Sequence, residues 1–134
     1  MSIQWTKDLA VGVEKIDQQH KTLFAKINDL LDACNAGRGR TIVGEMIGFL
    51  GNYVVEHFDA EEKYMIKYNY PGYKAHKTYH EEFIKNFSQL KDRLETDGVN
   101  IYLVILTNRI VIDWLNKHIS RVDKELGRYL KDKL

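Results

Sequence analysis

Apolar residues return every three or four positions along four stretches of this chain, which is the spacing of one buried face on an α-helix. The first predicted helix runs from Asp17 to Asn35, and the second runs from Thr41 to Tyr68. The third begins near Pro71, and the fourth begins after Gly98. None of these stretches shows the sustained alternation of a strand. The pattern therefore predicts an all-α protein.

Short turns separate the four predicted helices. The breaks fall at Asn35–Arg40, Asn69–Gly72 and Thr96–Gly98, where glycine, asparagine, aspartate and the single proline gather. Asp17 and Thr41 are predicted N-caps, and Pro71 suits a first helical turn. Helices joined by such short turns are antiparallel neighbours. We expect an up-down-up-down antiparallel four-helix bundle, with an irregular N-terminal arm before Asp17 and a short C-terminal helix around Asp123–Lys133.

Composition narrows the class of protein. The chain has 134 residues, of which 44% are hydrophobic, so residues 1–134 are expected to form one domain with a substantial core. A formal net charge of +1 argues against a basic face for nucleic acid or an anionic membrane. The single cysteine cannot form an intrachain disulfide. No apolar run suits a signal peptide or a membrane span, so we expect a soluble, cytoplasmic protein.

The histidines supply the candidate chemistry, because all of them fall into a pattern typical of metal ligands. They are His20, His57, His76, His80 and His118. Glu61 follows His57 by four residues, and His80 follows His76 by four, so each pair shares one helix face. Imidazole suits iron, copper, nickel and zinc. One histidine on an apolar face is usually a core residue, but burying five imidazoles with two carboxylates and no metal would be costly. The pattern predicts a two-metal site.

Asp123, the second candidate carboxylate, lies five residues after His118. At about 3.6 residues per turn, a straight helix would rotate it about 140° away from His118. We therefore predict a bend, a break or a π-like turn within Ile119–Asp123.

The number of ligands indicates a vacancy. Two octahedral metals offer twelve positions, and five imidazoles, two bridging carboxylates and one bridging oxide or hydroxide fill eleven of them. An open position is typical of binding or catalysis rather than of a purely structural site.

These residues resemble those of a known family, the hemerythrins, and specifically the stand-alone bacterial hemerythrins. The matching pieces are Gly12–His20, His57–Glu62, Tyr70-Pro71 followed by His76 and His80, and Trp114–Ile119 leading to Asp123. The likeness extends from Trp5 to the C-terminal helix, and the order and spacing of the histidines and carboxylates are specific to the family.

The resemblance implies a non-haem di-iron centre. One iron would be held by His76, His80 and His118, and the other by His20 and His57. Glu61, Asp123 and an oxo or hydroxo group would bridge the two irons. Dioxygen would bind at the open position of the second iron, and the residues lining that position would be Leu115, Ile119, Trp114 and Phe24.

Reversible dioxygen binding is the function that the resemblance implies, in the role of carrier, store or delivery to an oxygen-consuming enzyme. No sixth histidine remains as an acid to cleave the O–O bond, so we do not expect an enzyme. The alternatives are a di-iron oxidase or peroxidase, an oxygen sensor acting through a separate partner, and iron storage. Ferritin-like enzymes place a glutamate three residues before a histidine, and this chain never does.

Overall fold

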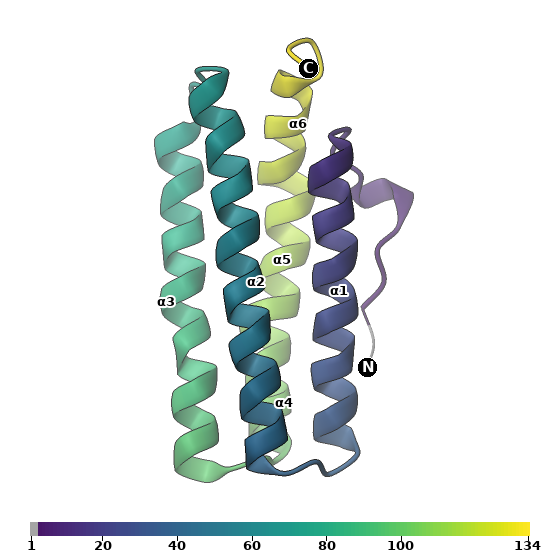
Figure 1. Ribbon diagram of the computed structural model, residues 1–134, viewed down its shortest axis with the longest axis vertical. Helices are drawn as coiled ribbons and strands as arrows, with labels where there is room; N and C mark the ends of the chain where they lie inside the picture. Colours follow the sequence, from purple (N-terminus) through teal and green to yellow (C-terminus); the bar gives the residue numbers. More distant parts are fainter. Residues whose placement is uncertain (1–2) are drawn as a thin grey trace.

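Four long helical rods stand side by side in Figure 1, and each runs antiparallel to the one before it. The computed structural model describes residues 3–134. The first three rods are α1 (Glu14–Asn35), α2 (Arg40–Lys67) and α3 (Tyr73–Asp97). The fourth is a continuous succession of α4 (Ile101–Thr107), η2 (Asn108–Asp113), α5 (Trp114–Lys117), η3 (His118–Asp123) and α6 (Lys124–Leu130). The predicted all-α four-helix bundle is confirmed.

The start of α1 differs from the prediction. The helix begins at Glu14, so Asp17 lies inside its first turn and is not the N-cap. The Asp17 carboxylate instead accepts hydrogen bonds from the backbone N–H groups of Val11 (2.8 Å) and Gly12 (3.4 Å). The Asp17 side chain therefore binds the backbone that precedes α1 and does not cap the helix.

The other predicted helix ends also shift. The N-cap of α2 is Gly39, whose backbone is extended, so Thr41 lies within the helix and the predicted Thr41 cap is wrong. Pro71 precedes α3 rather than occupying its first turn, because the turn after α2 extends through Gly72. The predicted C-terminal helix is α6, which ends at Leu130 and continues the fourth rod without a break.

The fourth rod contains the predicted irregularity. Residues His118–Asp123 form a π-helical segment, η3, so the predicted irregularity within Ile119–Asp123 is confirmed, and of its three possible forms it is the π-like turn. A π-helix bonds residue i to residue i+5 and so places residues five apart above each other. This widening brings Asp123 back beneath His118. A second π-helical segment, η2, lies one short helix earlier and was not predicted.

The N-terminal arm packs along the outside of α1, as Figure 1 shows. The Ile3 backbone exchanges two hydrogen bonds with the Asn28 side chain, at 2.8 and 2.7 Å. After the 3₁₀ turn η1 (Lys7–Leu9), the arm passes α6 so closely that a Cβ on Gly127 would lie 2.0 Å from the Val11 carbonyl oxygen. The expected irregular arm is therefore present, and it is held at both of its ends.

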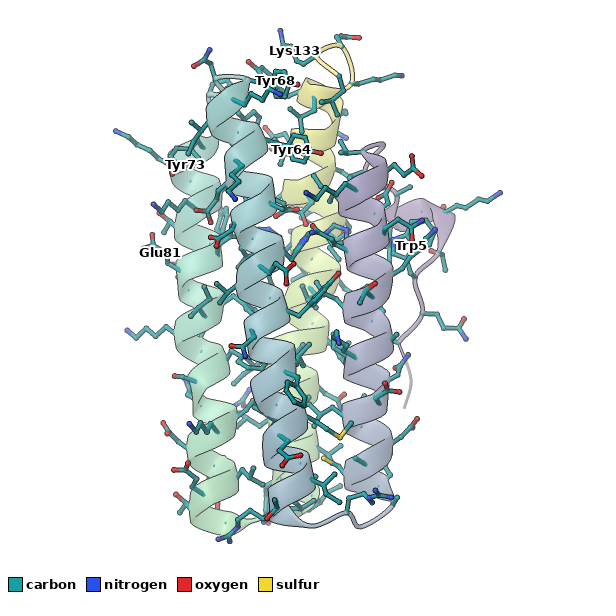
Figure 2. The ribbon with its side chains drawn as sticks, viewed as in Figure 1. Trp5, Tyr64, Tyr68, Tyr73, Glu81 and Lys133 are labelled. Carbon is teal, nitrogen blue, oxygen red and sulfur yellow. The ribbon has the colours of Figure 1, made fainter. Side chains whose placement is uncertain are left out.

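Apolar side chains fill the space between the rods, which Figure 2 shows along the whole length of the bundle. Each rod contributes fully buried leucines, among them Leu30, Leu50, Leu90 and Leu103. The second rod approaches the third closely at Gly51, where an added Cβ would lie 2.9 Å from Phe87 Cε1. Among residues 3–134, no helix is long and apolar enough to cross a membrane.

Candidate metal centre

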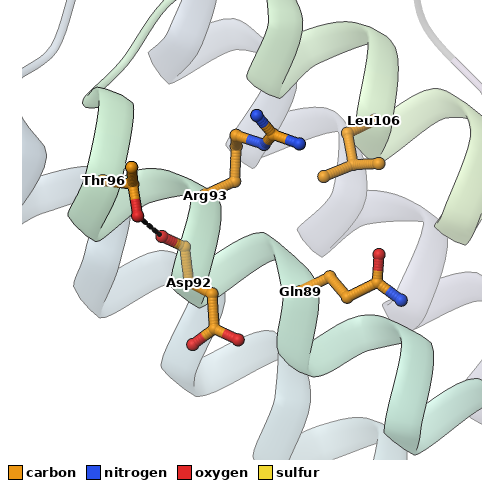
Figure 3. A pocket seen from close by; sticks show the side chains of 5 residues that line it. All are labelled: Gln89, Asp92, Arg93, Thr96 and Leu106. Carbon is orange, nitrogen blue, oxygen red and sulfur yellow. Dashed lines mark hydrogen bonds between the residues drawn. The ribbon is translucent and has the colours of Figure 1, made fainter.

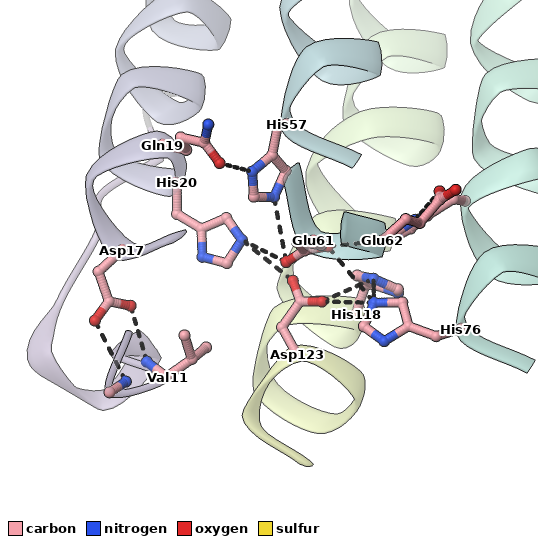
Figure 4. A network of polar contacts seen from close by, with 12 residues as sticks. Val11, Asp17, Gln19, His20, His57, Glu61, Glu62, His76, His118 and Asp123 are labelled. Carbon is pink, nitrogen blue, oxygen red and sulfur yellow. Dashed lines mark hydrogen bonds and ion pairs between the residues drawn. The ribbon is translucent and has the colours of Figure 1, made fainter. Parts of the chain in front are cut away.

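The alternating direction of the rods brings all seven predicted ligands to one level of the bundle. His20 lies near the start of α1, and His57 and Glu61 lie toward the end of α2. His76 and His80 lie near the start of α3, and His118 and Asp123 bound η3 on the fourth rod. In an antiparallel bundle the start of one rod stands beside the end of the next. The side chains consequently converge in the space between the rods, as Figure 4 shows.

These side chains are removed from solvent almost completely. Six of the seven expose at most 1% of their surface, and His118 exposes 4%. Burial of so many polar groups is unfavourable unless opposite charges or metal ions compensate it. His118 is the member of the cluster that lies nearest to the surface.

Each carboxylate directs its two oxygens toward different histidines. Glu61 Oε1 lies 3.0 Å from His80 Nε2 and 3.5 Å from His76 Nε2. Its other oxygen, Oε2, lies 3.4 Å from His57 Nε2 and 3.7 Å from His20 Nε2. Glu61 thus stands between two groups of imidazoles with one oxygen facing each group.

Asp123 repeats this division from the opposite rod. Its Oδ1 lies 3.0 Å from Nε2 of both His76 and His118, and its Oδ2 lies 3.2 Å from His20 Nε2. The ligand-type atoms fall into two sets, each within 4.8 Å of one another: Glu61, His76, His80, His118 and Asp123, and His20, His57, Glu61 and Asp123. The two carboxylates are the members that both sets share.

The charges of the cluster shift its protonation equilibria. Burial alone would lower the pKa of His20, but the neighbouring carboxylates of Asp123 and Glu61 raise that pKa to about 9. The same balance raises the pKa of His76 to about 9. Burial would raise the pKa of both carboxyl groups, but the imidazoles hold each pKa below its ordinary range. Ionised carboxylates in this space need positive charge beside them, which either protons on the imidazoles or metal ions can provide.

The inward-facing atoms fit metal ions better than they fit hydrogen bonds. Among residues 3–134, no hydrogen-bond partner meets either oxygen of Glu61 or Asp123, or the Nε2 atoms of His20 and His80. His76 Nε2 and His118 Nε2 lie 3.1 Å apart, nitrogen against nitrogen. Ligands about 2.1 Å from a shared ion, at right angles to each other, lie about 3.0 Å apart. The donor set and its spacing therefore suit metal ions, with imidazole nitrogen and carboxylate oxygen as ligands.

Two residues to which the sequence analysis gave no role contact the outer faces of the histidines. Gln19 Oε1 lies 2.7 Å from His57 Nδ1, and Glu62 Oε2 lies 3.0 Å from His80 Nδ1. Gln19 and Glu62 each sit next to a predicted ligand in the sequence. Each of them contacts a histidine on the adjacent rod and not the ligand beside it in the sequence. Such a contact depends on how the rods pack and cannot be read from one helix alone.

Aromatic rings enclose the imidazoles. The Phe58 ring stacks on His80 with ring centroids 3.8 Å apart and 3° between the planes. Trp114 stacks on His118 at 4.3 Å and 13°. Of the residues predicted to line the oxygen position, Phe24, Leu115 and Ile119 are buried, and Trp114 is only half-buried. Trp114 contacts His118, a histidine of the three-imidazole set, and the lining of an oxygen position by these four residues stays a prediction.

Surface hollows differ in their relation to the cluster. One of about 300 Å³ reaches His118 and is lined by Tyr79, Glu82, Trp114, Lys117, Arg121 and Val122 as well. Another, of about 260 Å³, is lined by Gln89, Asp92, Arg93, Thr96 and Leu106 and is shown in Figure 3. Gln89 follows His80 by nine residues, which is about 13 Å along a helix axis. The second hollow thus lies toward the opposite end of the bundle.

Comparison with known proteins agrees with this geometry. Residues 11–130 match the family model described as the hemerythrin HHE cation binding domain. The chain belongs to the hemerythrin family. A bacteriohemerythrin of Methylococcus capsulatus is 35% identical over 92% of this chain and 92% of its own length. A bacteriohemerythrin of Pseudomonas aeruginosa is 36% identical over 89% of this chain and 75% of its own.

More distant members and solved structures extend the comparison. A myohemerythrin of Theromyzon tessulatum is 28% identical over 90% of this chain. A crystal structure of wild-type hemerythrin superposes with a TM-score of 0.85 and 34% identity, covering 96% of this chain and 98% of that one. The hemerythrin resemblance inferred from the spacing of the histidines is therefore confirmed, together with the fold that it implied.

Proposed function

We propose that this hemerythrin binds dioxygen reversibly at a di-iron centre. The observation that carries the proposal is the division of each buried carboxylate between two imidazole sets, one of three histidines and one of two. In this proposal His76, His80 and His118 hold one iron, His20 and His57 hold the other, and Glu61 and Asp123 bridge them. A hydroxo or oxo group would complete the centre. The relatives named bacteriohemerythrin and myohemerythrin support the choice of iron and of dioxygen.

The unequal sets explain why a small molecule would bind at one side. With both carboxylates shared, an iron beside His20 and His57 would have one protein ligand fewer than an iron beside His76, His80 and His118, which would leave it a free coordination position. An iron pair, when bound in its reduced state, would supply the electrons that dioxygen binding requires. The protein contributes the enclosure, because a buried site admits a small neutral gas and excludes bulk water.

Apolar residues are proposed to line the open position and keep it dry. Phe24 follows His20 by one helical turn, and Leu115 and Ile119 flank His118 on the fourth rod; all three are at most 2% exposed. Water and anions that reach a reduced iron pair promote its irreversible oxidation, so a smaller side chain should shorten the life of the oxygenated protein. Leu115→Ala is expected to accelerate autoxidation, and an unchanged rate would remove Leu115 from this role.

Carriage, storage and delivery to an oxygen-consuming enzyme all require the same reversible binding, and the proposal covers each of them. The test is anaerobic reconstitution of the metal-free protein with ferrous iron, followed by exposure to dioxygen. We expect a visible charge-transfer band that appears under dioxygen and disappears under argon over repeated cycles. Irreversible oxidation accompanied by hydrogen peroxide would instead favour the alternative of a di-iron oxidase.

A further inference from the structure

Two of the five cluster histidines have a side-chain acceptor behind them, and the two acceptors differ in charge. His57 Nδ1 meets the neutral amide oxygen of Gln19 at 2.7 Å. His80 Nδ1 meets the carboxylate of Glu62 at 3.0 Å. Among residues 3–134, no hydrogen bond reaches the buried Nδ1 atoms of His20 and His76. Each metal set thus contains one supported imidazole, with an anionic support in the three-histidine set and a neutral support in the two-histidine set.

Both supports cross from one rod to the next. Gln19 on α1 reaches His57 on α2, and Glu62 on α2 reaches His80 on α3. An acceptor oxygen at Nδ1 requires the proton to sit on Nδ1, which leaves the Nε2 lone pair free to face the carboxylate oxygens of the cluster. Phe58 stacks on the His80 ring and fixes its plane, so the Glu62 contact and the ring stack together leave His80 one orientation.

The charge of Glu62 has an additional effect. Hydrogen bonds to an ionised acceptor are stronger than those to a neutral one. A carboxylate behind a ligating imidazole increases electron donation by that imidazole to the metal, and removal of such a partner typically lowers metal affinity about 10- to 100-fold. Glu62 is 18% exposed and Gln19 is half-buried, so neither contact is a freely solvated surface pair.

We propose that Gln19 and Glu62 are positioning residues that fix the metal-facing nitrogens of His57 and His80, and that the carboxylate of Glu62 makes the His76–His80–His118 position the tighter of the two metal sites. The proposal rests on the proposed function only in assuming that two metal ions bind. It concerns metal affinity, which can be measured without iron or dioxygen.

The test is a Co²⁺ titration of the metal-free protein against a competing chelator, monitored by the visible absorption of bound cobalt. Two binding steps are expected for the unaltered chain. Glu62→Gln keeps the size of the side chain and removes its charge, and it should weaken the tighter step about tenfold while leaving the weaker step unchanged. Glu62→Ala removes the acceptor as well and should weaken the same step further, toward about 100-fold.

The reciprocal change addresses the other site. Gln19→Glu adds the charge behind His57 and should strengthen the weaker step, so that the two affinities approach each other. Gln19→Ala should weaken that step alone. The matched control is Glu81→Gln, which removes the same charge from an exposed glutamate next to His80 in the sequence and should leave both steps unchanged.

A merely structural role predicts a different pattern. In that case the variants would lower the denaturation midpoint of the metal-free protein, and both cobalt affinities would fall together. Equal affinities for Glu62→Gln and the unaltered chain, or a loss confined to the weaker step, would overturn the proposal. Absence of two cobalt steps in the unaltered chain, by contrast, would overturn the two-metal site itself and with it the proposed function.

Discussion

At the scale of single residues, the buried cluster balances five imidazoles against two carboxylates. Without metal, the carboxylates raise the pKa of His20 and of His76 from 6.5 to about 9, despite burial. The imidazoles lower the pKa of Glu61 and Asp123 below their ordinary values of 4.5 and 3.8. Protons and metal ions therefore compete for the same nitrogens, because a ligating imidazole must be neutral.

This competition predicts how the stability of the metal-free protein depends on pH. A raised histidine pKa contributes stability that is fully present below pH 6.5 and is lost as the pH rises through about 9. The lowered carboxyl pKa values contribute stability above about pH 4.5, which is lost in acid. Urea denaturation midpoints should therefore fall between pH 6.5 and 9 for the metal-free protein. The metal-loaded protein should show no such fall, and a flat or rising metal-free profile would contradict the assignment.

The identity of the seven clustered residues could be predicted from the sequence because histidine is rare here and the spacings four, four and five are diagnostic. The supports Gln19 and Glu62 could not be predicted, because their contacts cross between rods. The stacking of Trp114 on His118 could not be predicted from the sequence either. Contacts between rods depend on how each rod is rotated about its own axis, and the sequence of one rod does not determine that rotation.

At the scale of elements, the π-helical segment η3 decides whether Asp123 can reach the cluster. An α-helix places residues four apart on one face, and the wider π-helix does so for residues five apart. In η3 the residue four after His118 is Val122, which is half-buried and lines the surface hollow beside Tyr79, whereas Asp123 is buried among the histidines. The five-residue spacing between His118 and Asp123 therefore indicated the π-helical segment correctly.

Moving the carboxylate by one residue tests this geometry. Asp123→Ala should bind less than a full metal pair, because one bridging ligand is lost. The double variant Asp123→Ala/Val122→Asp should not restore binding, because Val122 points toward the surface hollow. Metal content after dialysis, measured by atomic emission, distinguishes the two outcomes. Asp113→Ala, at an exposed aspartate on the same rod, is the control and should keep the pair. Recovery in the double variant would mean that the segment is a regular α-helix.

Helix boundaries were the least predictable elements. The sequence placed N-caps at Asp17 and Thr41, but both residues lie inside helices. Asp17 instead accepts hydrogen bonds from the backbone N–H groups of Val11 and Gly12 in the arm. A short polar side chain can serve either the chain before a helix or the helix itself, and only the path of the arm decides between them.

At the scale of the whole molecule, the N-terminal arm runs along the outside of α1 and contacts α6 just beyond the end of η3. Val11 rests on Gly127 of α6, four residues beyond Asp123, with no room for a side chain between them. The turn between α2 and α3 is tied to the same helix, because the Tyr129 hydroxyl donates a hydrogen bond of 2.7 Å to the Tyr68 carbonyl oxygen. These contacts hold α6, and with it the end of η3, against the rest of the bundle.

Two glycine substitutions test the contribution of the arm. Gly127→Ala should lower the free energy of unfolding by about 1–3 kcal/mol, because the added Cβ meets the Val11 backbone and must displace it. Gly48→Ala is the matched control. Among residues 3–134, no atom outside the two adjacent residues and the neighbouring backbone of α2 lies within 4 Å of a Cβ added at Gly48. It should raise stability by about 0.5–1 kcal/mol through the lower entropy of the unfolded chain. Equal effects of the two substitutions, measured by urea denaturation, would show that the arm is not held at Gly127.

In the proposed function, dioxygen binds between the two imidazole sets and leaves with its O–O bond intact. The most direct measurement exposes the ferrous protein to ¹⁸O₂, removes free gas, releases bound gas under vacuum and analyses it by mass spectrometry. We expect ¹⁸O₂ to be recovered in proportion to the iron pairs, with the protein ready for another cycle. Recovery of labelled water or hydrogen peroxide in place of ¹⁸O₂ would contradict reversible binding.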